Sequence, residues 1–93
     1  MAIASFRCPE TKEVFEGGKA PRFANIRKVL ERKLAMLHAA SVTNDLRIPP
    51  SNHLEALKGD RAGQHSIRVN DQFRLCFRWT SEGPADVECV DYH

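Results

Sequence analysis

Apolar and polar residues alternate along residues 73–79, and this alternation is the clearest structural signal in the chain. The apolar positions are Phe73, Leu75, Phe77 and Trp79, and the positions between them are Arg74, Cys76 and Arg78. Successive side chains of a β-strand point to opposite faces, so the segment predicts a strand with one apolar and one cationic face. We expect the apolar face to pack on a core and the cationic face to meet an anion.

Two further segments predict strands on either side of this one. Residues 64–69 precede it across an Asn70-Asp71 turn, and residues 85–90 follow it after the polar stretch 81–84. Short connections make consecutive strands antiparallel neighbours, so the three segments predict a meander.

Helical periodicity is present in the first half of the chain. Apolar residues recur at three- and four-residue spacing from Phe23 to Leu37, which predicts a helix from Pro21 to about Ala40 with one apolar stripe. A shorter helix is expected at residues 10–15. We expect the stripe to pack on the apolar face of the 73–79 strand.

The rest of the chain carries weaker signals. Residues 2–7 are expected to form a short strand, and Gly17-Gly18 to end the short helix. Residues 41–56 show no clear period, and Pro49-Pro50 argues against a helix or a central strand there.

These elements predict one α+β domain spanning residues 1–93, because two domains of this total length would each lack a core. An N-terminal strand and two helices are expected on one face of a small antiparallel sheet that ends in the three-strand meander. The other face of the sheet is expected to remain free for binding.

The net charge of +2 is too small to indicate nucleic acid by itself, but the charge is unevenly distributed. Residues 58–78 hold five cationic side chains and two aspartates. The cations are Lys58, Arg61, Arg68, Arg74 and Arg78, and the aspartates are Asp60 and Asp71. This local excess is typical of a surface that binds phosphates, although many solvated faces look similar.

The three cysteines, Cys8, Cys76 and Cys89, share no CxxC spacing, so neither a disulfide framework nor a zinc site is expected. Cys76 and Cys89 fall in apolar strand patterns and are expected to be small core residues. No apolar run approaches the ~20 residues of a membrane span, and the first residues lack a signal-peptide pattern. We therefore expect a cytoplasmic protein with no membrane partner.

Four motifs stand in a fixed order in the second half of the chain. They are LKGDR at residues 57–61, GQHSIR at 63–68, NDQFRLCFRW at 70–79 and the closing DYH at 91–93. Together they resemble the HigB toxins of the RelE-like superfamily of bacterial toxin–antitoxin systems. The first half resembles that family only in length and helical pattern.

The resemblance implies a RelE-like fold and an endoribonuclease that cuts messenger RNA in the ribosomal decoding site without a metal or other cofactor. It also implies a HigA-like helix-turn-helix antitoxin, through which operator DNA would be contacted. Carried over by motif position, the candidate catalytic residues are Lys58, Arg74, Asp91, Tyr92 and His93. The candidate RNA-binding residues beside them are Arg61, Arg68 and Arg78. Some members have a histidine just upstream of the LKGD run, where this chain has His53 at a nearby position.

Cleavage of RNA by its own 2′-hydroxyl needs a base, an acid and cations that stabilise charge on the phosphate. The planar guanidinium of Arg74 can bind a phosphate through two N–H groups, and the ammonium of Lys58 offers a compact positive charge. Asp91 or His93 suits proton transfer, and Tyr92 suits base stacking or proton donation. The residues leave the assignment of acid and base open. Regular alternation puts Asp91 and Tyr92 on opposite faces and would bury Asp91, so a shared site requires the last residues to twist.

Two other functions compete with this interpretation. A non-catalytic module that blocks translation by occupying RNA or the ribosome would need the same basic face. A DNA-binding domain is a weaker hypothesis, because the sequence shows no helix-turn-helix pattern.

Overall fold

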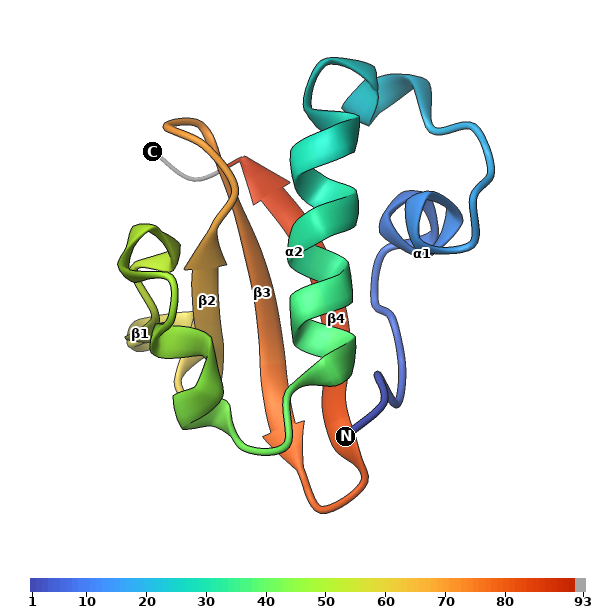
Figure 1. The fold of residues 1–93 in the computed structure, drawn as a ribbon. Coiled ribbons are helices and arrows are strands. Elements are labelled where there is room, and N and C mark those ends of the chain that lie inside the picture. Colours follow the sequence, from blue (N-terminus) through green and yellow to red (C-terminus); the bar gives the residue numbers. More distant parts are fainter. Residues whose placement is uncertain (92–93) are drawn as a thin grey trace.

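The computed structural model describes residues 1–91 and contains a four-stranded antiparallel sheet in the order β1-β2-β3-β4 (Figure 1). The strands are β1 (Glu55–Ala56), β2 (His65–Arg68), β3 (Phe73–Thr80) and β4 (Gly83–Asp91). The predicted meander is confirmed in β2, β3 and β4. Strand β1 is an additional edge strand in the stretch where no period was found, and its two residues are too few to show one.

The alternation along β3 sorts its side chains as predicted at the centre of the sheet. Leu75 and Phe77 are fully buried in the main core. Directly opposed residues of an antiparallel pair share a face, so Ser66, Cys76 and Glu88 lie together on the other face.

A β-bulge interrupts the pairing of β3 with β4. The register changes from Cys76 opposite Glu88 to Arg78 opposite Ala85, so β4 carries one extra residue. Asp86 lies within the bulge with φ of 52°, in the left-handed region. Its carboxylate accepts a hydrogen bond from Arg78 Nε at 2.9 Å, so the bulge turns an acidic group toward a β3 arginine.

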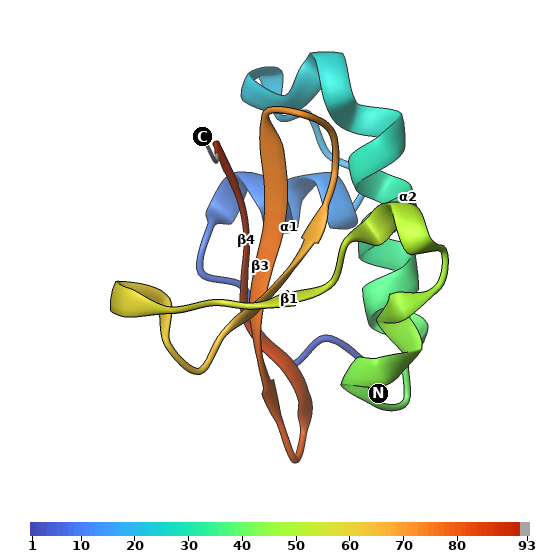
Figure 2. The same ribbon diagram turned by 90° about the vertical axis from the view of Figure 1, so that its left-hand side faces the viewer.

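Helix α2 (Arg27–Ala39) lies across one face of the sheet, and α1 (Pro9–Phe15) lies beside β4 and packs against α2 (Figure 1, Figure 2). A 3₁₀ segment, Pro21–Ile26, leads into α2, so the predicted 21–40 helix consists of two elements. The predicted apolar stripe is buried throughout: Phe23, Ile26, Leu30, Leu34 and Leu37. The Phe23 ring meets the Phe73 ring edge-on at 5.9 Å, which confirms that the stripe packs on β3.

Residues 2–7 do not form the regular strand that was predicted. Phe6 makes one parallel bridge with Val87, and backbone hydrogen bonds join the segment to Pro84 and Val87. The pairing stays short because Pro84 has no N–H to donate and the Asp86 bulge breaks the row of backbone groups along β4.

The face opposite α2 is only partly open, contrary to the expectation of a free face. Figure 2 shows the chain that carries β1 crossing the edge of the sheet and continuing into a loop on the side away from α2. Leu57 and Cys76 are buried outside the main core cluster. Arg61 on this loop reaches Glu88 of β4 at 2.8 Å between Nη1 and Oε1. The loop therefore covers one end of the face and leaves the end around Arg74 accessible.

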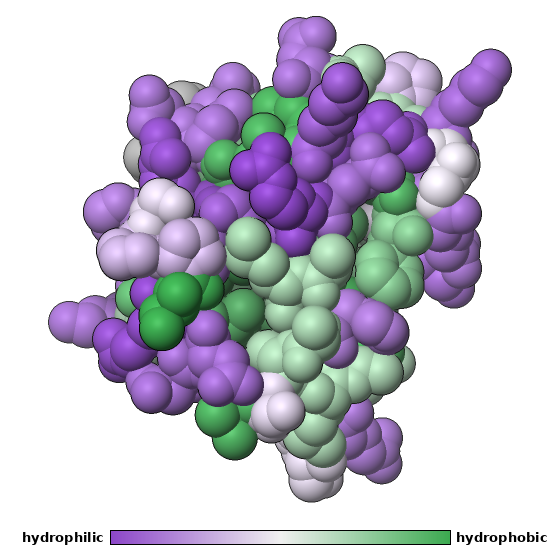
Figure 3. Space-filling view, in the orientation of Figure 1, coloured by the Kyte–Doolittle hydropathy of each residue, from purple (hydrophilic) through white to green (hydrophobic). Residues whose placement is uncertain are grey.

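The surface on the α2 side is divided by polarity. Figure 3 shows hydrophilic residues over the N-terminal half of α2 and more hydrophobic residues around its C-terminal half and the connection that follows. Val42 and Ile48 are the largest exposed apolar side chains of that connection. Within residues 1–91, the structure contains no helix with the length and apolarity needed to cross a lipid bilayer.

The three thiols differ in burial, which predicts a difference in reactivity. Burial raises the pKa of Cys89 to about 12 and raises the pKa of Cys76 above its ordinary value, whereas Cys8 is partly exposed. Only the thiolate is a nucleophile, so Cys8 alone is expected to react quickly with a disulfide reagent in the native protein. All three should react after unfolding in denaturant. Rapid modification of Cys76 in folded protein would contradict the burial.

Candidate functional site

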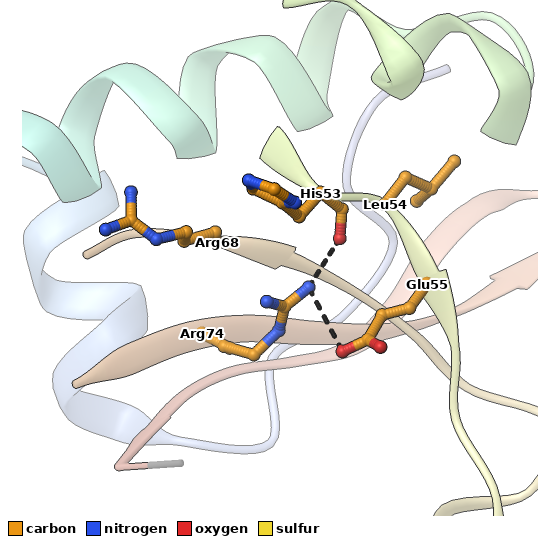
Figure 4. A pocket seen from close by; sticks show the side chains of 5 residues that line it. All are labelled: His53, Leu54, Glu55, Arg68 and Arg74. Carbon is orange, nitrogen blue, oxygen red and sulfur yellow. Dashed lines mark hydrogen bonds and ion pairs between the residues drawn. The ribbon is translucent and has the colours of Figure 1, made fainter. Parts of the chain in front are cut away.

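Arg74 is the most firmly held cation on the face opposite α2. Its side chain is only 12% exposed. Its Nε donates to Ser66 Oγ at 2.7 Å, and its Nη2 donates to the His53 carbonyl at 2.6 Å. The Glu55 carboxylate lies at the solvent side, 3.5 Å from Nη2 (Figure 4). A guanidinium oriented by two neutral oxygens keeps its charge and its direction, which suits it to bind a phosphate.

An open depression of about 400 Å³ lies beside Arg74 at the β1 edge of the sheet. Its lining consists of His53, Leu54, Glu55, Arg68 and Arg74 (Figure 4). The volume falls in the range of small-ligand sites, and two arginines and one carboxylate are among the lining residues. The structure therefore brings the predicted residues Arg68 and Arg74 together, with His53 beside them.

Glu55 is the lining residue that the sequence prediction missed. Its partner in the β1–β2 register is Ser66, so Glu55 lies on the face of the sheet that carries Arg74. A two-residue strand gives no periodic signal. Only its position in the sequence could have identified Glu55 as a site residue. It stands three residues before Lys58, in the stretch where the family resemblance directed attention to a histidine.

Each of the other predicted RNA-binding arginines pairs with a carboxylate. Arg61 pairs with Glu88, Arg68 with Asp71 and Arg78 with Asp86. The cationic excess counted along residues 58–78 is therefore largely balanced in the fold, because β4 supplies Asp86 and Glu88 from outside that stretch. Exposed ion pairs are worth only about 0–1 kcal/mol, so a phosphate can replace the carboxylate at Arg68 or Arg78 at small cost.

Asp91 lies on a different face from Arg74. It is the last residue of β4 and pairs with Phe73, whereas Arg74 pairs with Val90. The side chains of Asp91 and Arg74 therefore leave the strand pair on opposite sides. Asp91 is exposed rather than buried, and its Oδ2 accepts a hydrogen bond from Gln72 Nε2 at 3.0 Å.

The remaining predicted residues are Lys58, Tyr92 and His93. Lys58 is exposed and precedes the 3₁₀ turn Gly59–Arg61 at the far end of the loop. The register places Ala56 level with Phe77, three residues or ~10 Å along β3 from Arg74, and Lys58 lies further on. Tyr92 and His93 lie outside the described residues.

No group of three or more histidine, cysteine, aspartate or glutamate side chains converges within residues 1–91.

Comparison with solved structures finds the same fold in two other proteins. The YoeB–YefM complex from Staphylococcus aureus contains a chain that aligns with a TM-score of 0.61 at 18% identity, covering 100% of this chain and 99% of that one. The YoeB/ParE toxin from Agrobacterium tumefaciens aligns with a TM-score of 0.58, also at 18% identity, with full coverage of both chains.

Sequence comparison gives a more specific relationship. Toxin HigB-1 of Vibrio cholerae is 46% identical over 95 aligned residues, which cover 100% of this chain and 98% of that protein. A family model described as the RelE-like toxin of the type II toxin–antitoxin system HigB matches residues 4–93. The match includes the first half of the chain, where the motifs gave no guidance. The chain therefore belongs to the HigB family of RelE-like toxins of type II toxin–antitoxin systems.

Proposed function

We propose that this toxin is a ribosome-dependent endoribonuclease that cuts messenger RNA by attack of a 2′-hydroxyl on the adjacent phosphate. One observation carries the proposal: a mostly buried, hydrogen-bonded Arg74 lies beside the Glu55 carboxylate at an open depression. A fixed cation and a carboxylate are two of the groups that metal-independent RNA cleavage needs.

Arg74 and Glu55 divide the first half of the reaction between them. Glu55 takes the proton from the 2′ oxygen as that oxygen forms its bond to phosphorus. Arg74 stabilises the charge that builds on the non-bridging oxygens while the bond to the 5′ oxygen breaks. Because Nη2 of Arg74 lies 3.5 Å from Glu55 Oε1, both groups reach one phosphodiester bound in the depression.

The second half of the reaction needs a proton donor for the departing 5′ oxygen. Tyr92 and His93 stay the predicted candidates, because both residue types donate protons near neutral pH or when hydrogen-bonded. Lys58 is assigned a contact with RNA phosphate at the far end of the loop, outside the depression. Asp91, on the other face of the strand pair, is assigned no contact with the phosphodiester bound beside Arg74. Arg61, Arg68 and Arg78 extend the phosphate contacts along the same face.

The partners follow from membership of the family. We infer that a HigA-like helix-turn-helix antitoxin neutralises this toxin and that operator DNA is contacted only through that antitoxin. The ribosome and its bound messenger RNA are the targets, which places the activity in the cytoplasm. No membrane partner is proposed.

Mapping messenger RNA 5′ ends after a pulse of toxin expression tests the proposal. New 5′ ends within translated reading frames are expected, and they should disappear when ribosomes are kept from initiating. Intact messages under stalled translation would instead identify a module that acts by occupancy. The placement of Asp91 on the face opposite Arg74 favours that alternative, because it separates two predicted catalytic groups.

Glu55→Gln is expected to slow cleavage of ribosome-bound messenger RNA by about 10²–10⁴-fold, the usual contribution of a general base. Glutamine keeps the size of the side chain, so RNA binding should be retained or become tighter as a negative charge leaves the site. Single-turnover cleavage and RNA affinity would be measured separately. Glu82→Gln, in the exposed β3–β4 turn, is the matched control. Full activity in Glu55→Gln would remove Glu55 from the proposed mechanism.

A further inference from the structure

Helix α2 buries a lysine for which the proposed chemistry has no direct use. Lys33 is 6% exposed, and its ammonium donates a hydrogen bond to Asn52 Oδ1. Within residues 1–91 no carboxylate pairs with it. Burial lowers the pKa of Lys33, and the neighbouring charges of Arg32 and Arg68 lower it further. Burying a cation without an opposite charge is unfavourable, so an apolar residue would serve stability better at this position.

The partner of Lys33 is a fully buried amide that joins three segments. Asn52 has no exposed surface, and its Nδ2 donates to the Leu46 carbonyl at 3.1 Å. The same Nδ2 lies 3.9 Å from Met36 Sδ on α2. Asn52 therefore ties α2 to the two 3₁₀ turns Thr43–Arg47 and Pro50–Asn52, which lead to the depression.

The residue after Asn52 contacts the site directly. His53 adopts a left-handed conformation, with φ of 44° and ψ of 56°, and its N–H donates to the Pro50 carbonyl. Its own carbonyl accepts the 2.6 Å hydrogen bond from Arg74 Nη2. Glu55 follows two residues later. Asn52 thus comes shortly before both the His53 carbonyl, which orients Arg74, and the Glu55 carboxylate. Figure 4 shows these two groups beside Arg74.

We propose that Asn52, held by Lys33, is a positioning residue that fixes the His53 carbonyl and thereby aims the Arg74 guanidinium at the phosphate. This role rests on the nuclease function proposed above. It adds that Lys33 of α2 helps to hold Arg74 in place through Asn52. A displacement of about 1 Å in a reacting group is enough to slow catalysis about 10²-fold, so loose anchoring of this turn should affect turnover more than RNA binding.

Steady-state kinetics on ribosome-bound messenger RNA provide the first test. Asn52→Ala is expected to lower kcat about 10- to 100-fold and to change KM by less than about threefold. Asn25→Ala makes the same substitution at an exposed position in the segment before α2 and should leave both constants unchanged. A rise in KM with unchanged kcat would overturn the positioning role.

A double variant separates positioning from stability. Lys33→Met with Asn52→Leu replaces both polar partners by apolar side chains of similar volume, an exchange that buried pairs generally tolerate. The variant is expected to stay folded and to be more stable than Asn52→Ala, which leaves Lys33 unpaired. It should still show the lowered kcat, because leucine does not bind the Leu46 carbonyl. Wild-type kcat in this variant would show that the polar pair is not needed to aim Arg74 and would refute the proposal.

The Nε–H resonance of Arg74 gives a readout that needs no RNA. In wild-type protein this N–H donates to Ser66, and it should be sharp and slow to exchange with water. In the double variant it is expected to shift and exchange faster, while the Arg78 Nε–H bonded to Asp86 should not change. An unchanged Arg74 signal would overturn the proposal. If the double variant shifts the Arg74 signal but the wild-type protein cuts no message, the positioning of Arg74 by Asn52 is supported. That result would count only against the nuclease function.

Discussion

Arg74→Ala is expected to lower messenger RNA cleavage about 10²–10³-fold, the effect of removing one group that stabilises transition-state charge. The guanidinium is held by Ser66 and His53, whereas the neighbouring Arg68 is paired with Asp71, so Arg68 is expected to compensate only weakly when Arg74 is removed. Arg74→Lys should recover little activity, because an ammonium lacks the planar fork that bonds both oxygens and a phosphate. Single-turnover cleavage on programmed ribosomes measures the effect, and growth arrest on expression reports it in cells.

The fold should survive the loss of Arg74. Ser66 loses its side-chain partner, a loss of about 1–3 kcal/mol when a buried group is left unsatisfied. Arg22→Ala is the matched control, since Arg22 forms an exposed ion pair with Glu10 and takes no part in the depression. Undiminished cleavage by a folded Arg74→Ala variant would refute the proposed site, and unfolding of the variant would show in circular dichroism.

Leu30→Asp is expected to abolish folding. Leu30 is fully buried in the main core, and removing its side chain from that core loses about 1.5–3 kcal/mol of burial. The unpaired carboxylate adds a desolvation penalty of several kcal/mol. The sum approaches the whole stability of about 5–15 kcal/mol that a domain has. Circular dichroism and solubility should therefore show unfolded, aggregating protein.

A matched variant on the same helix tests the direction of the stripe. Ala35 is exposed on α2, so Ala35→Asp introduces the same carboxylate into water. The expected loss is under about 1 kcal/mol, the difference in helix propensity. Comparable destabilisation by both substitutions, or a folded Leu30→Asp variant, would show that α2 presents a different face to the sheet.

The sequence was informative where a period ran for at least seven residues. The β3 alternation and the stripe from Phe23 to Leu37 predicted the elements that build the core, and both packed as expected. Short elements escaped prediction for the same reason, since β1 has only two residues. Residues 2–7 were predicted as a strand, but their pairing depends on Pro84 and the Asp86 bulge, which no local pattern in the segment reveals.

The candidate site followed a similar division. Arg74 was predicted from its motif position and Arg68 from the local excess of cations, and the register places them opposite each other beside the depression. Glu55 was missed, because its value comes from lying beside Arg74 rather than from any motif of its own. The basic stretch looked unbalanced because Glu55, Asp86 and Glu88 lie outside it in sequence, although all three meet its arginines in space.

The sequence by itself determined the core, the meander and the family, because side-chain alternation, helical spacing and ordered motifs are local properties of the chain. The tertiary structure alone decided which charges are neutralised, that Asp91 is exposed rather than buried, and which carboxylate accompanies Arg74. Those outcomes depend on strand register and on a loop that crosses the sheet edge. Since one residue of register reverses the face of every side chain, they could not be read from sequence spacing alone.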